Sequence, residues 1–356
     1  MSIDVLIIDP ITSPPDAAEV DSRGGATSPA DLPTENPETH SKSETGAGQG
    51  SAANGLAARG DIQTRTLADI TRDYVQLTKP RIVVMILVTT MATAVMGAQG
   101  LVALSDLVWL LLGTALVAGS AGAANQIWER VIDCSMARTA NRPLPDGRLD
   151  LVPATLFTAA IGLVGSALLA QVFGMIPALA GIATWLLYVL VYTPMKTRTA
   201  WNTTVGAVAG ALPVLIGYTA TGGSLMAWTP WLLVGVLVAW QYPHFMSIAW
   251  MYRRQYDEAG FRMTTTVEPS GRSAGWQSIA GSIALIACGI TLAWIPGGMI
   301  APILATLGVI AACYPMLKAS IRFAASPNDA MARKLLRSSL LVLPALLLIV
   351  TLRVFW

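Results

Sequence analysis

Three polar side chains lie at helical spacing where a long apolar run of the sequence ends. Asn125, Glu129 and Asp133 are four residues apart, and this spacing puts all three on one face of an α-helix. Arg138 and Arg142 follow, again four apart. Mg²⁺ prefers carboxylate and other oxygen ligands, usually with substrate phosphates, and arginine binds phosphate oxygens through charge-assisted hydrogen bonds. The pattern therefore predicts a magnesium site beside an anion, and a diphosphate ester fits both halves.

The alternative is a helix end whose charges are solvated or paired with one another, for example Asp133 with Arg130. Each residue alone is compatible with that alternative. The whole set favours a site, because the preceding helix is rich in small residues that allow close helix packing. Ionisable side chains within or at the edge of a membrane are energetically costly, and such residues usually mark functional sites.

A second polar loop has a similar composition. It runs from Trp250 to Met263 and contains Tyr252, Arg253, Tyr256 and Asp257 among its polar and aromatic residues. If both loops lie on one side of the membrane, they could close over one cavity. A solvated basic loop explains this second stretch equally well.

Four further residues are candidates for substrate binding. Lys196, Arg198 and Asn202 could extend an anion site, although the two basic residues could equally determine topology. His244 is the only histidine in the apolar part of the chain, and a lone histidine near a helix end is more often a hydrogen-bonded core residue.

The composition is that of a multi-span membrane protein. Of the 356 residues, 54% are hydrophobic and 12% are charged, with a mean hydropathy of +0.57, whereas soluble domains carry about 25% charged residues. The net charge of +2 gives no reason to expect nucleic acid as a partner, and the three cysteines form no metal or disulfide motif. We therefore expect an all-α bundle in the lipid bilayer.

Nine apolar segments are long enough to cross a membrane. Lys and Arg concentrate before the first segment and in the connections 2–3, 4–5, 6–7 and 8–9, whereas the opposite connections contain none. This bias predicts that the N-terminus and both polar loops are cytoplasmic, at the inner (cytoplasmic) membrane of a cell. The predicted spans are 82–98, 104–127, 151–171, 175–193, 202–220, 229–250, 277–295, 299–318 and 336–355.

The N-terminal part differs from the rest. Of the 21 acidic residues, 12 lie at or before Asp73, among many Ser, Pro and Gly residues. Such a segment buries too little apolar surface to offset its ordering entropy. We therefore predict a disordered extension over residues 1–70 and a membrane domain over 71–356. A short amphipathic lead from Leu67 to Leu77 crosses this boundary and precedes the first span.

Several ordered motifs resemble those of the UbiA-type intramembrane prenyltransferases, over about residues 75–345. Within that superfamily they are most similar to the heme O synthase (protoheme IX farnesyltransferase) branch. The motifs are Leu77-Thr78-Lys79-Pro80-Arg81; Asn125-x3-Glu129-x3-Asp133-x2-Met136-x-Arg138-Thr139-x-Asn141-Arg142-Pro143-Leu144-Pro145; Tyr192-Thr193-Pro194-Met195-Lys196-x-Arg198-Thr199-x-Trp201-Asn202; Gly206-x3-Gly210-Ala211-x-Pro213-x3-Gly217; Trp240-Gln241-x-Pro243-His244-Phe245; and Tyr256-x2-Ala259-Gly260-x2-Met263.

The resemblance implies a reaction and its participants. Farnesyl diphosphate and Mg²⁺ would bind at Glu129 and Asp133, with Asp257 as a further metal contact. A vinyl group of heme b would attack the farnesyl carbon, and Tyr252 and Tyr256 could stabilise the allylic cation through their π faces. Heme O would then pass to a heme-modifying or oxidase-assembly protein.

The sequence also departs from the family pattern. Glu129 stands where the superfamily usually has Asp, and Gln255 stands where the second signature usually has Asp; Arg262 and Thr264 flank Met263 in place of Pro and Leu. The residues therefore leave three alternatives open. They are a UbiA-type enzyme with another acceptor, such as an aromatic acid or quinone precursor, a degenerate member that only binds heme or lipid, and a membrane transporter.

Overall fold

The computed structural model describes residues 65–355, and these are helical with no strand among them. In this part of the chain, nine helical segments are long and apolar enough to cross a membrane. The predicted all-α, nine-span fold is thus confirmed, and the amphipathic lead is a helix, α1 (Leu67–Leu77). Most of the predicted N-terminal extension, residues 1–64, lies outside the described residues.

The membrane helices extend beyond the predicted apolar segments at the end of the bundle where the polar loops lie. The largest differences are at α3, which continues to Asp133, at α13, which continues to Ala325, and at α12 and α14, which begin several residues early. The spans were predicted from apolar residues, whereas these helices continue through polar residues beyond the apolar segment. The spans are α2 (Pro80–Ala98), α3 (Leu104–Asp133), α4 (Leu151–Phe173), α5 (Met175–Leu186) with the π-helical turn η1 (Leu187–Tyr192) and α6 (Thr193–Met195), α7 (Asn202–Ala211) with α8 (Pro213–Ala220), α9 (Trp228–Met251), α12 (Arg272–Trp294), α13 (Ile300–Ala325), and α14 (Asp329–Leu352) with η2 (Arg353–Phe355).

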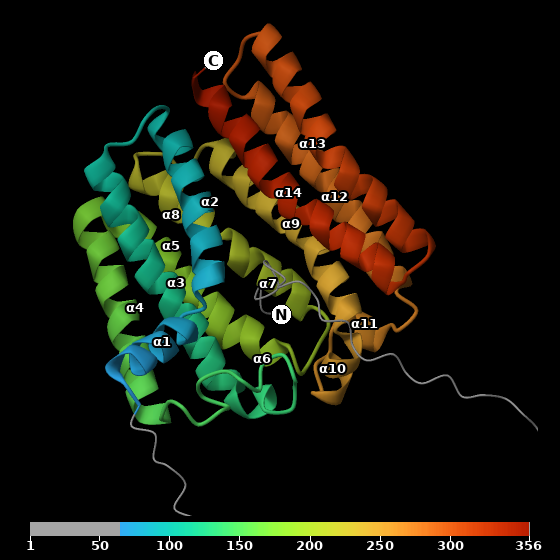
Figure 1. The fold of residues 1–356 in the computed structure, drawn as a ribbon. Helices are drawn as coiled ribbons and strands as arrows, with labels where there is room; N and C mark the ends of the chain where they lie inside the picture. The colour runs from blue at the N-terminus through green and yellow to red at the C-terminus, as the bar shows by residue number, and fades with distance from the viewer. Residues whose placement is uncertain (1–64, 356) are drawn as a thin grey trace, which may run out of the picture. The chain divides into compact units, whose positions relative to one another are not determined.

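The helices pack mainly against their neighbours in the chain (Figure 1). α3 packs on α4, α12 packs on both α9 and α13, and α14 packs on α9 and α13. α2 lies against α8, which is distant in sequence. A core of buried residues joins α9, α12, α13 and α14 and includes Leu233, Leu285, Val309 and Leu343.

The entry into α2 has an unusual backbone. Pro80 occupies the first turn of the helix, where its missing N–H needs no partner. A proline disfavours the right-handed helical region for the residue before it, and Lys79 adopts the left-handed region with φ 58°. Gly122 of α3 lets this turn approach, because a Cβ there would lie 2.9 Å from the Thr78 carbonyl oxygen. The turn places the buried Lys79 side chain against α3.

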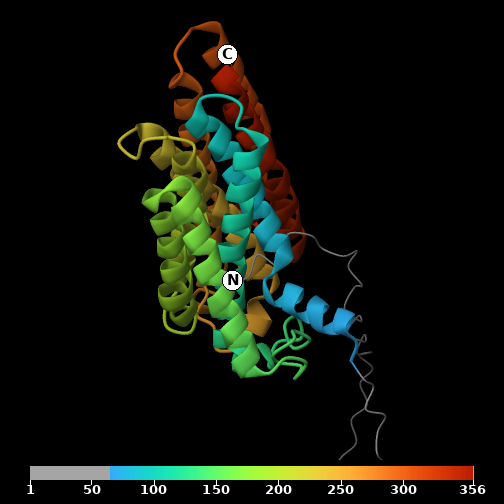
Figure 2. The same cartoon turned by 90° about the vertical axis from the view of Figure 1, so that its left-hand side faces the viewer.

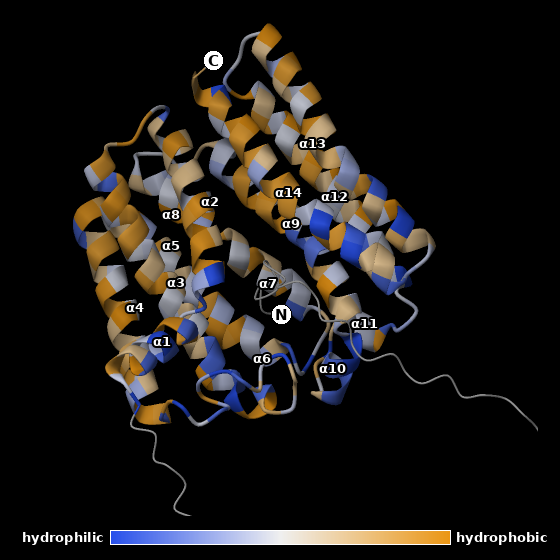
Figure 3. Cartoon of the chain, in the orientation of Figure 1, coloured by the Kyte–Doolittle hydropathy of each residue, from blue (hydrophilic) through white to orange (hydrophobic). Residues whose placement is uncertain are grey.

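The polar residues gather at one end of the bundle. Figure 2 shows α1 lying across this end rather than along the membrane helices, and Figure 3 shows hydrophilic residues around α1, α6 and α10 (Arg253–Glu258). α1 is held there by an ion pair between Asp73 and Arg148 and by Gln126 Nε2, which donates to the Gln76 carbonyl oxygen at 3.1 Å. The second loop adds the short helix α11 (Thr264–Val267).

Candidate active site

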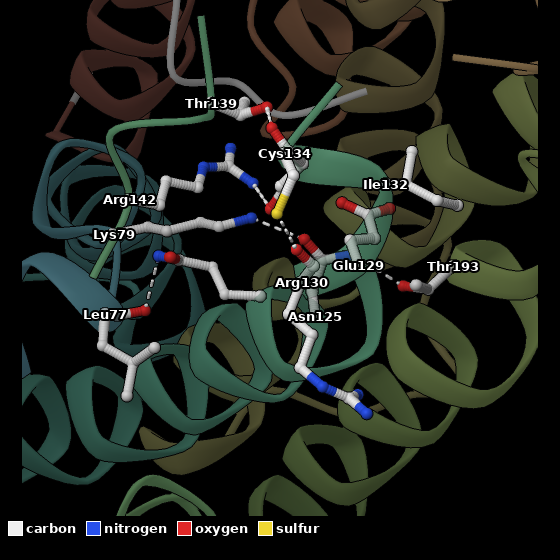
Figure 4. Close-up of polar contacts among 12 residues, drawn as sticks. Leu77, Lys79, Asn125, Glu129, Arg130, Ile132, Cys134, Thr139, Arg142 and Thr193 are labelled. Carbon is white, nitrogen blue, oxygen red and sulfur yellow. Dashed lines mark hydrogen bonds and ion pairs between the residues drawn. The ribbon is translucent and has the colours of Figure 1, made fainter. Parts of the chain in front are cut away.

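Asn125, Glu129 and Asp133 lie on one buried face of α3, with relative exposures of 0%, 3% and 0%. Each side chain accepts a hydrogen bond of 2.6 Å from a basic side chain outside α3. Lys79 Nζ donates to Asn125 Oδ1, Lys196 Nζ to Glu129 Oε1, and Arg142 Nη1 to Asp133 Oδ2. Lys79 and Arg142 reach α3 from the same side (Figure 4). Three segments of the chain therefore deliver cations to one helix face.

The alternative pairing of Asp133 with Arg130 does not occur. Arg130 Nη1 donates to the Ile127 carbonyl oxygen at 3.0 Å, and its guanidinium points away from Lys79 and Arg142 in Figure 4. Asp133 is instead bound by Arg142, nine residues further along the chain. The loop after α3 thus folds back over the end of its own helix, and the Thr139 hydroxyl supports this turn by donating to the Asp133 carbonyl oxygen at 3.0 Å.

Lys196 follows α6 and is almost fully buried. Its ammonium group lies 4.8 Å from the centroid of the Tyr192 ring and 5.9 Å from that of Phe261. Burial is the largest single influence on the pKa of Lys196 and lowers it, but attraction by Glu129, the hydrogen bond to its carboxylate and further favourable interactions together raise the pKa above its usual value. Lys196 therefore stays charged.

The two polar loops meet over this end of the bundle. Arg138 from the first loop lies 5.3 Å from the Tyr252 ring centroid in the second, and the Tyr252 and Tyr256 rings are in edge contact at 6.3 Å. The Arg262 backbone N–H donates to the Lys196 carbonyl oxygen at 2.7 Å. Burial raises the pKa of Tyr256, so its hydroxyl stays protonated. The structure therefore brings Arg138, Tyr252 and Tyr256 together with the α3 face.

Other predicted residues lie differently. Arg253 Nη1 donates to Asp329 at 2.9 Å and its guanidinium covers Trp250, so it joins α10 to α14. Asp257 and Arg198 are exposed. Asn202 is buried and donates to the Arg262 carbonyl oxygen at 2.9 Å, which links α7 to the second loop. Substrate roles for these four residues stay predictions.

His244 lies inside the bundle, between α9 and α14. Its Nδ1 is 2.9 Å from the Ser339 hydroxyl, and its ring stacks on Trp240 with 4.8 Å between centroids. These contacts agree with the alternative of a hydrogen-bonded core histidine. Its Nε2 is buried without a hydrogen-bond partner among residues 65–355, so a role in binding substrate stays a prediction.

The oxygen donors on α3 suit Mg²⁺. Asp133 Oδ1 on α3 and Gln255 Oε1 in the second loop are both buried, and neither has a hydrogen-bond partner within the described part of the chain. Such atoms carry a desolvation cost that a metal ion would relieve. Within residues 65–355, however, no group of three or more His, Cys, Asp or Glu side chains could hold a metal. The exposed Asp257 is therefore not gathered with Glu129 and Asp133, contrary to the predicted three-carboxylate set.

Two cavities meet at Lys79, which was missing from the predicted site residues. One, of about 470 Å³, is bordered by α1, the start of α2 and the first loop. The other, of about 80 Å³, extends into the bundle and is mostly apolar, with Ile86, Val117, Tyr188 and Ile216 in its wall. The sequence signal available for this residue was the basic Leu77-Thr78-Lys79-Pro80-Arg81 motif before the first span; its left-handed backbone is a finding of the structure.

The UbiA prenyltransferase family model matches residues 86–341. The chain belongs to this family. A protoheme IX farnesyltransferase of Rhodopirellula baltica is 62% identical over 283 residues, covering 78% of this chain and 99% of the relative. The protoheme IX farnesyltransferase of Salinibacter ruber is 36% identical over 280 residues, covering 77% of this chain and 95% of that one. Membership of a prenyltransferase family argues against the transporter alternative.

Solved structures share the UbiA fold at low sequence identity. A digeranylgeranylglyceryl phosphate synthase superposes with a TM-score of 0.66 at 14% identity, covering 80% of this chain and 98% of that one. An Archaeoglobus fulgidus UbiA homolog bound to DMAPP and Mg²⁺ gives a TM-score of 0.57 at 17% identity, covering 78% and 99%. These likenesses establish the fold of the family member described here.

Proposed function

We propose that this chain transfers the farnesyl group of farnesyl diphosphate to a vinyl group of heme b, giving heme O and diphosphate. The observation that carries the proposal is the 62% identity with a protoheme IX farnesyltransferase over 99% of that relative's length. The site agrees with it, because Lys79, which donates to Asn125 on the polar face of α3, also lines a mostly apolar cavity. A diphosphate and an isoprenoid chain need those two environments.

Glu129 and Asp133 would hold Mg²⁺. The ion would neutralise part of the diphosphate charge and weaken the bond to the leaving group. Lys196 and Arg142 already lie 2.6 Å from these carboxylates. Both cations can therefore turn to diphosphate oxygens with small movements, and Arg138 of the same loop can add a bidentate contact.

In the proposed reaction, the bond between farnesyl C1 and the diphosphate oxygen breaks first. Arg138, Arg142 and Lys196 stabilise the negative charge that develops on the leaving diphosphate. The vinyl group supplies the electron pair for a new carbon–carbon bond to C1. Water then adds to the resulting cation next to the porphyrin and loses a proton, which gives the hydroxyl group of heme O.

The two loops limit quenching of the allylic cation by bulk water. Arg138 and Tyr252 close the cap from opposite loops, and the hydrogen bond between Arg262 and Lys196 holds the second loop against the end of α6. Arg138 lies over the Tyr252 ring, which is in edge contact with Tyr256. Once Arg138 turns to the diphosphate, the π faces of the two tyrosines would stabilise a cation formed at C1.

The distribution of basic residues supports a cytoplasmic location for this site, in the inner membrane of the cell. Heme b would enter from the bilayer or the cytoplasmic surface. The product would remain apolar enough to be passed within the membrane to a heme-modifying or oxidase-assembly protein.

The acceptor is tested by supplying purified protein in lipid vesicles with labelled farnesyl diphosphate, Mg²⁺ and either heme b or an aromatic acid such as hydroxybenzoate. We expect label in a heme product and none in the aromatic acid. Label in the aromatic acid alone would assign the chain to another branch of the family. Binding of heme b without any transfer would identify a degenerate, non-catalytic member.

A further inference from the structure

The cavity of about 470 Å³ beside α1 is strongly basic. Among the described residues 65–355, five cationic side chains line it and no carboxylate does, so this part of its wall is positive in net charge: Arg72, Lys79, Arg81, Arg138 and Arg142. Lys79 and Arg142 are buried, and Arg138 is half-buried. Arg72 and Arg81 are exposed at the cavity mouth. The three less accessible charges are screened less than those on an open surface, so the cavity should attract anions.

α1 fixes the outer wall of this cavity. Gln126, which is itself buried, donates through Nε2 to the carbonyl oxygens of Gln76 at 3.1 Å and Leu77 at 3.0 Å. The Tyr74 ring packs against Phe157 with 4.8 Å between centroids. The buried Asp73 pairs with Arg148 of the first loop. These contacts hold Arg72 at the cavity mouth.

The cavity has two chemically different halves. Arg138 and Arg142 belong to the loop after α3, and Arg142 is bound to Asp133, so this half adjoins the proposed diphosphate site. Arg72 of α1 and Arg81 of α2 make the other half, and no carboxylate from the described part of the chain lies in its wall. A diphosphate bound with Mg²⁺ needs carboxylate ligands. The outer half therefore suits an anion that binds without a metal, and a carboxylate matches arginine well.

We propose that Arg72 and Arg81 bind the propionate carboxylates of the porphyrin acceptor, an inference that rests on the proposed function. Heme b carries two propionates on one edge and its vinyl groups on the other half of the ring. Carboxylates held at this rim would turn the vinyl groups inward, toward Lys79. Lys79 lines both this cavity and the apolar one, so the vinyl end would approach the farnesyl chain where the two cavities meet.

The test uses the full-length protein in detergent or neutral-lipid vesicles and measures binding, not turnover. Heme b and its dimethyl ester are titrated by their absorbance change, and farnesyl diphosphate is titrated separately with Mg²⁺. The double variant Arg72→Gln/Arg81→Gln is compared with Arg130→Gln, which removes a charge from α3 that lies outside the cavity. Thermal unfolding of each variant checks that it folds.

We expect the double variant to bind heme b at least about tenfold more weakly, in line with the loss of charge-assisted hydrogen bonds. Its affinity for farnesyl diphosphate should match that of wild type, and Arg130→Gln should leave the affinity for both ligands unchanged. Wild type should prefer heme b over the ester, and the double variant should not.

Three results would overturn the inference. Equal binding of heme b and ester by wild type would exclude carboxylate recognition. Weaker binding of farnesyl diphosphate alone would assign the pocket to the diphosphate. Unchanged binding of heme b and of farnesyl diphosphate by the double variant would show that Arg72 and Arg81 bind neither substrate. A failure of the proposed function looks different: if heme is not the acceptor, wild type shows no saturable heme binding, and if the chain is non-catalytic, heme binds and no farnesyl group is transferred.

Discussion

At the scale of single residues, each buried carboxylate of the candidate site is paired with a cation from another segment of the chain. Glu129 and Asp133 are buried, and burying an unpaired carboxylate is costly. Lys196 and Arg142 each supply the missing charge from outside α3. The same four groups are the ones that a metal and a diphosphate would use, because the metal takes the carboxylates and the anion takes the cations. The ion pairs therefore keep the empty site folded and ready for both ligands.

The pair of Lys196 and Glu129 can be tested by stability. Lys196→Met leaves the Glu129 carboxylate buried without its partner, and we expect a loss of about 3–5 kcal/mol in the free energy of unfolding. Lys196→Met/Glu129→Gln removes both charges and should recover most of that loss, without recovering prenyl transfer. Unfolding in detergent, followed by circular dichroism, measures this. A double variant as unstable as the single one would show that the two side chains are not coupled.

The same pair predicts a pH dependence. In the folded protein, burial lowers the pKa of Lys196, but attraction by Glu129, the hydrogen bond between them and further favourable interactions raise it above its ordinary value of 10.5. A group with a raised folded pKa contributes stability that is fully present below its unfolded pKa and is lost as pH rises through the folded one. The difference in unfolding temperature between wild type and Lys196→Met should therefore stay constant from neutral pH to about pH 10 and become smaller only at higher pH. A decline between pH 7 and 9 would contradict the assignment.

At the scale of elements, the sequence was sufficient to predict the membrane spans and the polar face of α3. The apolar segments are long and the spacing of Asn125, Glu129 and Asp133 has only one helical interpretation. The partners of these residues were less predictable. Lys79 comes from a left-handed turn before α2 and Tyr192 from a π-helical turn, and neither backbone state has a periodic sequence pattern.

The second loop was the least predictable element. Arg253 and Asp257 have the residue types expected of an anion or metal site, yet Arg253 binds Asp329 of α14 and Asp257 is exposed. Both outcomes depend on how a short helix, α10, is rotated relative to distant parts of the chain. Composition alone does not determine that rotation.

The packing of α7 against η1 gives a prediction at this scale. A Cβ at Gly206 would lie 2.6 Å from Tyr192 Cε2, so Gly206→Ala should displace the ring that contacts Lys196. We expect prenyl transfer to fall about tenfold or more, since small misplacements of catalytic groups are costly. Gly308→Ala is the control, because its Cβ would meet only the end of the Ile349 side chain at 3.3 Å. Equal activity of the two variants would exclude this role for Tyr192.

At the scale of the whole membrane domain, the polar cap and its charge bias define one functional face. Arginine and lysine residues occur in the connections at that end and are missing from the connections 1–2, 3–4, 5–6 and 7–8. Because such a bias sets membrane orientation, the cap should face the cytoplasm, where a soluble diphosphate product can leave.

Cysteine labelling checks this orientation. Cys134 is exposed at the cap end of α3, whereas Cys313 is buried. A membrane-impermeant maleimide should label Cys134 in inside-out vesicles and not in intact spheroplasts. Ala103→Cys in a Cys134→Ser background places an exposed thiol in connection 1–2 and should give the opposite result. Labelling of Cys134 from the outside would reverse the topology.

The most direct test of the account is the formation of heme O by the reconstituted protein. Wild type in vesicles, given heme b, farnesyl diphosphate and Mg²⁺, should form heme O detectable by mass. Asp133→Asn, which keeps the size of the side chain but removes its charge, should lower the rate by about a hundredfold or more, while Asp106→Asn, exposed in the first turn of α3, should not. Near-normal heme O formation by Asp133→Asn, or none by wild type, would contradict the account.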